Sequence, residues 1–189
     1  TSCGAYGSLC SYHLKEDTMI LDTLIANPYQ GYAYSYPHKT AYRDFTPPIP
    51  LRDIWEAENK NSLFLYIHIP FCEMRCGFCN LFTMANPDED MTRTYLMALE
   101  RQSCIVRDAI GDVRFAQLAI GGGTPTFLNE GELESLFTII GNTMGTSSIK
   151  IPTSCEVSPK TVNKNKLQYL FEKGVGRISI SIQSFLEQE

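Results

Sequence analysis

Three closely spaced cysteines are the side chains of this chain with the clearest capacity for chemistry. Cys72, Cys76 and Cys79 follow one another in a C-x3-C-x2-C spacing, directly after the apolar run Leu65–Ile69 and Pro70. Thiolates are soft ligands for zinc or for iron–sulfur clusters. Three of them on one short loop after a strand can hold three corners of a metal cluster, and they leave the fourth corner without a protein ligand.

The spacing weighs against two common kinds of metal site. Structural zinc uses four ligands, typically as two pairs separated by a longer gap, and no second pair accompanies these cysteines. An ordinary [4Fe–4S] cluster takes four cysteines, but residue 81, where a nearby fourth would fit, is Leu81. The pattern therefore favours a three-cysteine cluster with one open iron, and structural zinc stays the less favoured alternative.

Two further patterns could carry chemistry, although each has an ordinary structural explanation. The run Gly121–Gly123 can bring backbone N–H groups close to a ligand, but a tight strand-to-helix turn explains it equally well. Glu156 and Gln183 fall on predicted strands. The carboxylate could simply pair with Arg177, and the glutamine could be a hydrogen-bonded core residue.

The elements that must position these residues alternate between strands and helices. The hydrophobic pattern predicts strands over residues 63–69, 115–120, 149–157 and 177–183. It predicts helices over residues 88–110, 130–143 and 162–173. We expect Asn129 to cap the second helix, Gly174 to end the third, and Cys104 to be a core thiol of the first. Such alternation indicates parallel βαβ units.

The faces of the strands favour a barrel. In the last strand Ile178, Ile180 and Ile182 alternate with polar residues. In an α/β barrel the outer strand face packs on helices, while the inner face can carry polar groups. A doubly wound sheet tends to have strands that are apolar on both faces. We therefore predict a half-open α/β barrel, with the candidate sites at the C-terminal ends of successive strands.

Composition limits the function classes. The 189 residues carry a net charge of −5, from 21 acidic and 16 basic residues, so charge supports neither a nucleic-acid nor a membrane-surface partner. The longest apolar runs are too short to span a bilayer, and no export signal is visible at the start. Seven cysteines, three of them clustered, fit reduced thiols in a cytoplasmic protein better than a disulfide framework.

The motifs together resemble radical S-adenosylmethionine (radical SAM) enzymes, in particular the oxygen-independent coproporphyrinogen III oxidase-like branch. The cysteine loop carries an aromatic residue, Phe78, just before Cys79. The other matching segments are Tyr66–Cys72, Gly121–Thr126, Glu156–Pro159 and Arg177–Phe185. The resemblance implies the N-terminal part of a partial (βα)6 TIM-like barrel with four parallel strands.

The resemblance also implies roles for individual residues. Cys72, Cys76 and Cys79 would bind a [4Fe–4S] cluster that cleaves S-adenosylmethionine reductively to a 5′-deoxyadenosyl radical, which abstracts hydrogen from a substrate. The residues expected to hold the nucleotide are Tyr66, Phe78, Gly122, Gly123, Thr124, Glu156 and Gln183. Glycine amides and Thr124 would meet its methionine end, and Glu156 its amine.

The implied partners are a small molecule, such as a tetrapyrrole of porphyrin biosynthesis, and an external electron donor such as flavodoxin or ferredoxin. Departures from the pattern bear on the substrate. Coproporphyrinogen oxidases proper carry a further cysteine where this chain has Leu81, and the haem-chaperone relatives carry Asp-Phe where it has Asn80-Leu81. The alternatives are a haem-binding or haem-delivery protein without turnover and, less favoured, a zinc module.

Three segments are expected. Residues 1–26 form a poorly ordered extension, residues 27–62 a lead-in rich in tyrosine and proline, and residues 63–189 a radical SAM core cut short on its C-terminal side. Four strands are too few to close such a barrel, so these residues alone are expected to aggregate or to fail to hold a cluster.

Overall fold

The computed structural model describes residues 42–76, 79 and 81–182. The chain divides into two compact units, Thr1–Pro48 and Ile49–Glu189. In the first unit, residues 42–48 are exposed and form neither helix nor strand. Residues 1–41, with the predicted extension and all but one of the lead-in tyrosines, lie outside the described part, so the predicted segment boundaries stay predictions.

The second unit is built of alternating strands and helices. Its strands are β1 (Leu63–Ile69), β2 (Phe71–Cys72), β3 (Met84–Ala85), β4 (Phe115–Gly122), β5 (Thr153–Val157) and β6 (Arg177–Ile180). Its helices are α2 (Leu51–Trp55), α3 (Glu89–Ile110), α4 (Glu130–Thr138) and α5 (Lys164–Glu172). A 3-10 turn covers Pro125–Phe127, and a π-helical turn, Ile139–Thr143, continues α4.

Four of the strands form one parallel sheet, as the alternating pattern predicts. Its order is β1-β4-β5-β6, so each strand pairs with the next long strand along the chain. Ile69 of β1 lies beside Gly122 of β4. Parallel strands place their C-terminal ends at one edge, and the cysteine loop, the glycine run and Glu156 therefore reach the same edge of the sheet.

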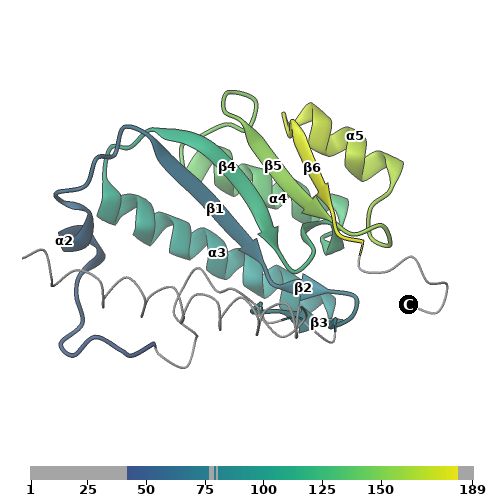
Figure 1. The fold of residues 1–189 in the computed structure, drawn as a ribbon, viewed down its shortest axis with the longest axis horizontal. Coiled ribbons are helices and arrows are strands. Elements are labelled where there is room, and N and C mark those ends of the chain that lie inside the picture. The colour runs from purple at the N-terminus through teal and green to yellow at the C-terminus, as the bar shows by residue number, and fades with distance from the viewer. Residues whose placement is uncertain (1–41, 77–78, 80, 183–189) are drawn as a thin grey trace, which may run out of the picture. The chain divides into compact units, whose positions relative to one another are not determined.

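One face of this sheet carries the hydrophobic core. The buried strand residues are Ile67, Ile69, Leu118, Ile120, Cys155 and Val157, and they pack against Leu96 of α3, Leu133 and Leu136 of α4, and Leu170 of α5. Figure 1 shows α3 and α4 together behind the sheet. On β1 and β5 the alternate residues Tyr66, His68, Ser154 and Glu156 are not buried, which confirms the predicted division into an apolar and a polar face.

Side-chain caps fix where the helices begin. Asn129 forms a capping box with Glu132, since each side chain bonds the backbone N–H of the other. Asp88 caps α3 and Asn163 caps α5 in the same position of each helix. Gly174 follows α5 with a φ of +86°, the left-handed conformation that ends helices. The predicted roles of Asn129 and Gly174 are confirmed.

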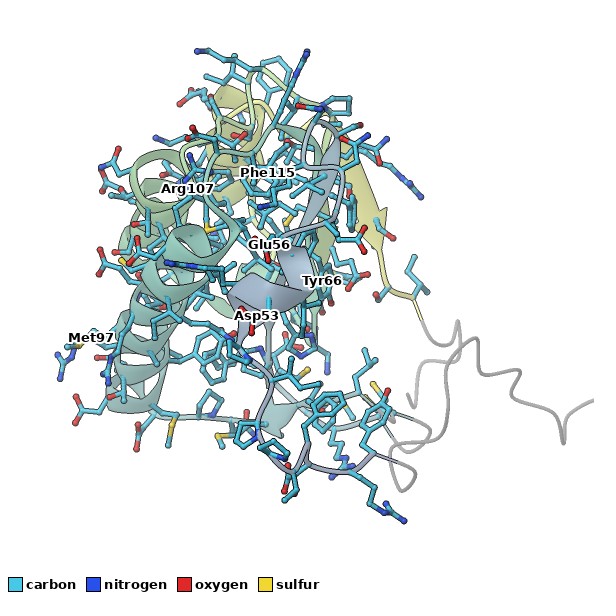
Figure 2. All side chains as sticks on the ribbon, turned by 90° about the vertical axis from the view of Figure 1, so that its left-hand side faces the viewer. Asp53, Glu56, Tyr66, Met97, Arg107 and Phe115 are labelled. Carbon is cyan, nitrogen blue, oxygen red and sulfur yellow. The ribbon has the colours of Figure 1, made fainter. Side chains whose placement is uncertain are left out.

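One prediction for α3, that Cys104 is a core thiol, is wrong. The buried residues of this helix are Thr92, Leu96, Ser103 and Ile110. Cys104 is exposed and not a core thiol, because it lies one residue, about 100° of helix rotation, beyond Ser103. Met97 likewise points away from the sheet (Figure 2), with 63% of its surface exposed.

Two strand predictions are also wrong in extent: the third strand begins later than predicted, and the fourth ends at Ile180 and not at residue 183. The third strand begins at Thr153, not at residue 149, and Ile149 is exposed in the preceding turn. In β6, the edge strand of the sheet, Ile180 is 56% exposed and not covered by a helix. Ile182 is also exposed and lies just after the strand.

The burial of Cys155 predicts an unusual pH dependence of thiol alkylation. Burial, with a smaller contribution from Glu156, raises the pKa of Cys155 to about 12. The thiolate is the reactive form, so its fraction should rise about tenfold per pH unit between pH 8 and 10. We expect the iodoacetamide rate of Cys155 in the folded protein, followed by peptide mass spectrometry, to rise in step. The exposed Cys104 should react faster at pH 8. A rate for Cys155 that levels off by pH 9 would contradict the assignment.

Candidate iron–sulfur and nucleotide site

The cysteine loop is closed at its base by a short pair of strands that the hydrophobic pattern did not reveal. Strands β2 and β3 pair in parallel, with Phe71 beside Met84 and Cys72 beside Ala85. The backbone N–H of Met84 donates to Pro70 (2.7 Å), and that of Asn86 donates to Cys72 (2.8 Å). The loop that carries the three cysteines is thus tied at both ends to the C-terminal end of β1.

The three thiols face one cavity of about 480 Å³ at the C-terminal edge of the sheet. It is lined by residues of the cysteine loop, the glycine run, and the segments after β5 and β6. They include all three cysteines together with Gly122, Gly123, Thr124 and Glu156. Candidate residues from three separate stretches of sequence therefore share a single cavity, as their positions after successive strands predict.

Glycine is required where the backbone of this edge comes closest to its neighbours. Gly122 has a φ of +117°, and a Cβ there would approach the His68 ring to 2.8 Å. A Cβ on Gly123 would lie 2.7 Å from both Cys72 Sγ and the Phe71 carbonyl oxygen. Non-glycine residues avoid the first conformation, and no side chain fits the second contact. The run is therefore more than an ordinary turn.

The amides of this run are already engaged within the protein. The Gly122 N–H donates to Glu156 Oε2 (3.1 Å). The Gly123 N–H donates to Ile69 O (2.8 Å) and the Thr124 N–H to Phe71 O (2.7 Å). The expected role of these amides as direct donors to a ligand therefore needs revision: in this arrangement they hold β1, β2 and β5 against the end of β4.

Glu156 is positioned by backbone and not by a cation. Its Oε2 accepts the Gly122 amide, and within the described residues Arg177 forms no ion pair with it. Gly121 leaves the space that the carboxyl group occupies, since a Cβ there would lie 3.1 Å from it. A carboxylate held in this way keeps its second oxygen, Oε1, able to accept a hydrogen bond from a ligand amine.

His68 links the strand to the far end of the cysteine loop. Its Nε2 lies 2.8 Å from Phe82 O, and because a carbonyl oxygen can only accept, Nε2 carries the proton. Its Nδ1 then accepts from the Tyr66 hydroxyl at 3.2 Å. Burial raises the pKa of Tyr66, and the negative charge of Glu156 raises it further. Tyr66 therefore stays protonated beside the carboxylate, although it does not itself line the cavity.

The thiols fit a cationic cluster. Burial raises the pKa of Cys72; a hydrogen bond from Thr124 lowers it, and Cys79, Cys76 and Glu73 raise it. The three sulfurs are thus within electrostatic reach of one another, and thiolates there need a positive partner. Among the described residues no three ligand side chains converge as on a single metal ion. A cluster distributes its cysteines over several irons, so three thiols around one cavity suit a cluster.

Two expected nucleotide residues, Phe78 and Gln183, lie outside the described residues. Several lining residues were not singled out from the sequence as site residues: Thr83, Ser158, Lys160 and Ser181. For three of them the signal is position, since Ser158 and Lys160 lie within three residues of the end of β5 and Ser181 directly follows β6. Parallel topology brings such residues to the site whatever their type.

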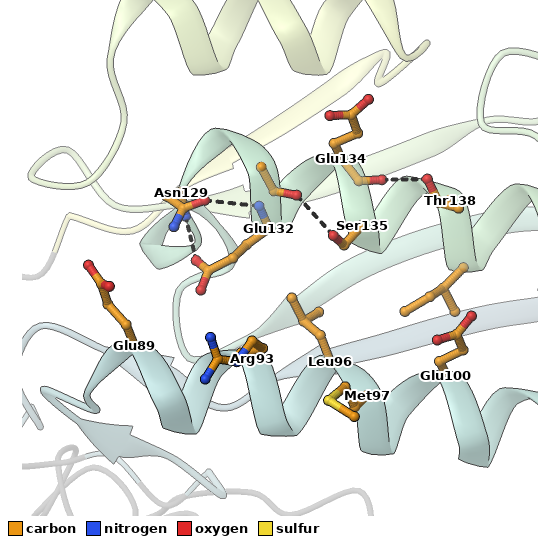
Figure 3. Close-up of a pocket in the computed structure, with 12 residues that line it drawn as sticks. Glu89, Arg93, Leu96, Met97, Glu100, Asn129, Glu132, Glu134, Ser135 and Thr138 are labelled. Atoms are coloured by element: carbon orange, nitrogen blue, oxygen red, sulfur yellow. Dashed lines mark hydrogen bonds between the residues drawn. The ribbon is translucent and has the colours of Figure 1, made fainter.

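A larger cavity of about 670 Å³ lies elsewhere, between α3 and α4 (Figure 3). It is lined by charged residues of both signs, among them Glu89, Arg93 and Glu132. Glu132 is occupied by the capping box and by the Thr92 hydroxyl. This groove belongs to the outer helical layer, away from the strand ends, and we place the candidate site in the smaller cavity that the cysteines line.

Comparison with known proteins identifies the family to which the chain belongs. The Radical SAM superfamily matches residues 66–188. The chain therefore belongs to the radical SAM superfamily, which confirms the predicted resemblance. The predicted branch is confirmed as well, because the most similar relatives include oxygen-independent coproporphyrinogen III oxidases.

Three relatives illustrate the similarity. The oxygen-independent coproporphyrinogen III oxidase of Helicobacter pylori (strain J99) is 33% identical over 68% of this chain and 28% of its own length. The heme chaperone HemW of Bacillus subtilis is 36% identical over 64% of this chain and 31% of its length. The solved coproporphyrinogen III oxidase (HemN) of Escherichia coli, a radical SAM enzyme, has a TM-score of 0.69 at 25% identity and covers 88% of this chain.

The chain spans about a third of the length of these relatives. The four-stranded parallel sheet corresponds to part of the TIM-like barrel of the solved relative, in agreement with the predicted fold class. In the part of the chain that the structure describes, no helix has the length and apolar character needed to cross a membrane.

The close contact at Gly123 can be tested by adding a single methyl group. We expect Gly123→Ala to destabilise the full-length protein by about 1–3 kcal/mol, as overpacking does, and to lower the iron retained after reconstitution. Urea unfolding and iron analysis measure the two effects. Gly131→Ala is the matched control: this glycine is helical with only an ordinary contact at 3.5 Å, so alanine should stabilise by about 0.5–1 kcal/mol. Equal stability of Gly123→Ala and wild type would refute the contact.

Proposed function

We propose that this protein is a radical SAM oxidoreductase of the coproporphyrinogen III oxidase-like branch. Its Cys72, Cys76 and Cys79 bind a [4Fe–4S] cluster, and S-adenosylmethionine occupies the adjoining part of the cavity. The observation that carries the proposal is that all three thiols, Gly122, Gly123 and Glu156 line one cavity. When bound, the cluster and nucleotide supply a 5′-deoxyadenosyl radical for hydrogen abstraction from a substrate.

The chain's own residues then bind and orient the nucleotide. Glu156 accepts hydrogen bonds from the ligand amine through the oxygen that the Gly122 amide leaves available. The Thr124 hydroxyl, which lies 3.9 Å from Cys72 Sγ, sits at the boundary between thiol and nucleotide. Phe78 and Gln183 are proposed to complete the nucleotide site, together with Tyr66, whose neutral hydroxyl bonds His68.

The proposed substrate is a small molecule. A tetrapyrrole is the leading class because the names of the relatives refer to coproporphyrinogen III or to heme. The proposed electron donor is external, a flavodoxin or ferredoxin. Apolar side chains at the cavity, Met74, Leu81 and Ile182, are each about half exposed. They offer apolar surface to the substrate in the same cavity that the polar Glu156 and Ser158 line.

A second candidate function is haem binding or delivery without turnover. It is favoured by the 36% identity to a relative described as a heme chaperone. Titration with haem, followed by absorbance, separates the two functions. Stoichiometric haem binding without nucleotide cleavage favours the carrier, and cleavage without haem binding favours the enzyme.

Product formation tests the enzyme directly. The full-length protein is reconstituted anaerobically with iron and sulfide, and given dithionite and S-adenosylmethionine. We expect 5′-deoxyadenosine by mass spectrometry, and loss of the product to background in Cys76→Ala, because three thiols are needed to hold the cluster. A cluster-bearing wild type without product, or a Cys76→Ala variant with undiminished product, counts against the proposal.

Glu156 is expected to govern nucleotide affinity but not cluster content. Glu156→Gln keeps an acceptor for the Gly122 amide but loses the charge that meets the ligand amine. A hydrogen bond to a charged group contributes about 1.5–3 kcal/mol, so the Kd for S-adenosylmethionine should rise about 10- to 100-fold in equilibrium dialysis. Glu100→Gln makes the same charge change on the outer face of α3 and should leave the Kd unchanged. Loss of iron in Glu156→Gln would assign the carboxylate a different role.

A further inference from the structure

Lys166 joins the two loops that form the nucleotide side of the cavity. It lies in the first turn of α5, and its Nζ donates to the carbonyl oxygens of Thr126 (2.6 Å) and Thr161 (3.2 Å). Thr126 follows the glycine run, and Thr161 belongs to the loop between β5 and α5. The two acceptors are 35 residues apart in sequence, so the ammonium group bridges separate segments.

Hydroxyl groups reinforce the same junction. Thr126 is fully buried, and its Oγ1 lies 2.8 Å from Thr161 Oγ1. The backbone N–H of Ser158 donates to Thr126 Oγ1 at 3.4 Å. Ser158 and Thr124, each a short step from this junction, both line the cavity. Movement at the junction would therefore shift these two cavity-lining residues.

A cation at this position is not explained by the helix alone. The first turn of a helix disfavours positive charge, and α5 has no acidic residue there to offset it. Burial lowers the pKa of Lys166, while Glu130 and Glu132 raise it. Lys164 stands in the same first turn but is exposed. The two hydrogen bonds to carbonyl oxygens offset the free-energy cost of removing part of the Lys166 ammonium group from water.

We propose that Lys166 is a positioning residue for nucleotide binding: its ammonium group holds the glycine loop and the Ser158–Thr161 loop at a fixed separation. It does not contact the nucleotide. It acts through Thr126 and Thr161 on Thr124 and Ser158, which both line the cavity. The effect on nucleotide binding rests on the proposed function. The hydrogen bonds of the junction are present in the folded chain without any ligand.

Hydrogen exchange tests the junction without any ligand. In the reconstituted full-length protein, Lys166→Met keeps most of the side-chain length and removes the donor. We expect amides in residues 121–128 and 157–163 to exchange about tenfold faster, as loss of about 1.4 kcal/mol of local stability implies, with strand β1 unchanged. Lys164→Met is the matched control and should change neither segment. Lys166→Arg, which keeps a charged donor, should restore most of the protection.

Nucleotide affinity gives the second readout. The Kd for S-adenosylmethionine should rise about tenfold in Lys166→Met, with iron and sulfide content equal to wild type. Unchanged exchange in both loops would overturn the proposal, and so would faster exchange spread evenly over the whole chain. If wild type itself binds no S-adenosylmethionine, the proposed function fails, while the exchange result still decides whether the junction exists.

Discussion

Three consecutive glycines at the end of β4 set the distances on which the site depends. Each lacks a side chain where a different strand comes close: Gly121 faces the Glu156 carboxyl group of β5, Gly122 the His68 ring of β1, and Gly123 the Cys72 sulfur of β2. A single methyl group at any of them would intrude on one neighbour. The end of β4 is therefore the point at which the thiol loop, the histidine and the carboxylate are brought together.

Hydrogen bonds convert this closeness into a fixed geometry. The amides of Gly122, Gly123 and Thr124 all have acceptors within the protein. A buried amide without an acceptor costs free energy. These bonds therefore hold residues 122–124 against β1, β2 and β5 without any ligand. What remains for a ligand are the carboxylate of Glu156, the hydroxyls and the sulfurs. A preorganised site of this kind binds without the cost of ordering its own loops.

The parts of the fold that follow from local pattern could be predicted from the sequence. Alternation placed Tyr66 and Glu156 on the polar face of the sheet, and Asn129 could be identified as a cap because its signal lies within three residues. Cys104 of α3 was wrongly assigned to the core because the buried stripe of this helix contains the polar Thr92 and Ser103. Thr92 reaches Glu132 of α4, a tertiary contact that apolar periodicity does not record.

The site residues also divide into those that local spacing predicts and those that depend on contacts between distant segments. Spacing singles out Cys72, Cys76 and Cys79, because three thiols on one loop are local in sequence. Lys166 could not be found by pattern, because its acceptor Thr126 lies 40 residues away and is a backbone carbonyl, which any residue provides. The bonds from His68 to Phe82 and from Glu156 to Gly122 are of the same type. In each of these bonds a specific side chain meets a backbone group. Because any residue can supply the backbone group, a single sequence contains no second residue type that would reveal the pair.

The residues that line the cavity bear on different questions. The cysteines, Gly122, Gly123 and Glu156 all line the cavity, and their thiols, backbone and carboxylate bear on the cofactor that it suits. Leu81 lies on the same cavity with half its surface exposed. Where the resemblance expects a further thiol in the coproporphyrinogen oxidases, this chain presents an apolar group that can neither ligate metal nor transfer a proton. Leu81 therefore changes the chemistry of the cavity lining without changing the thiols or the carboxylate that we propose hold the cofactor.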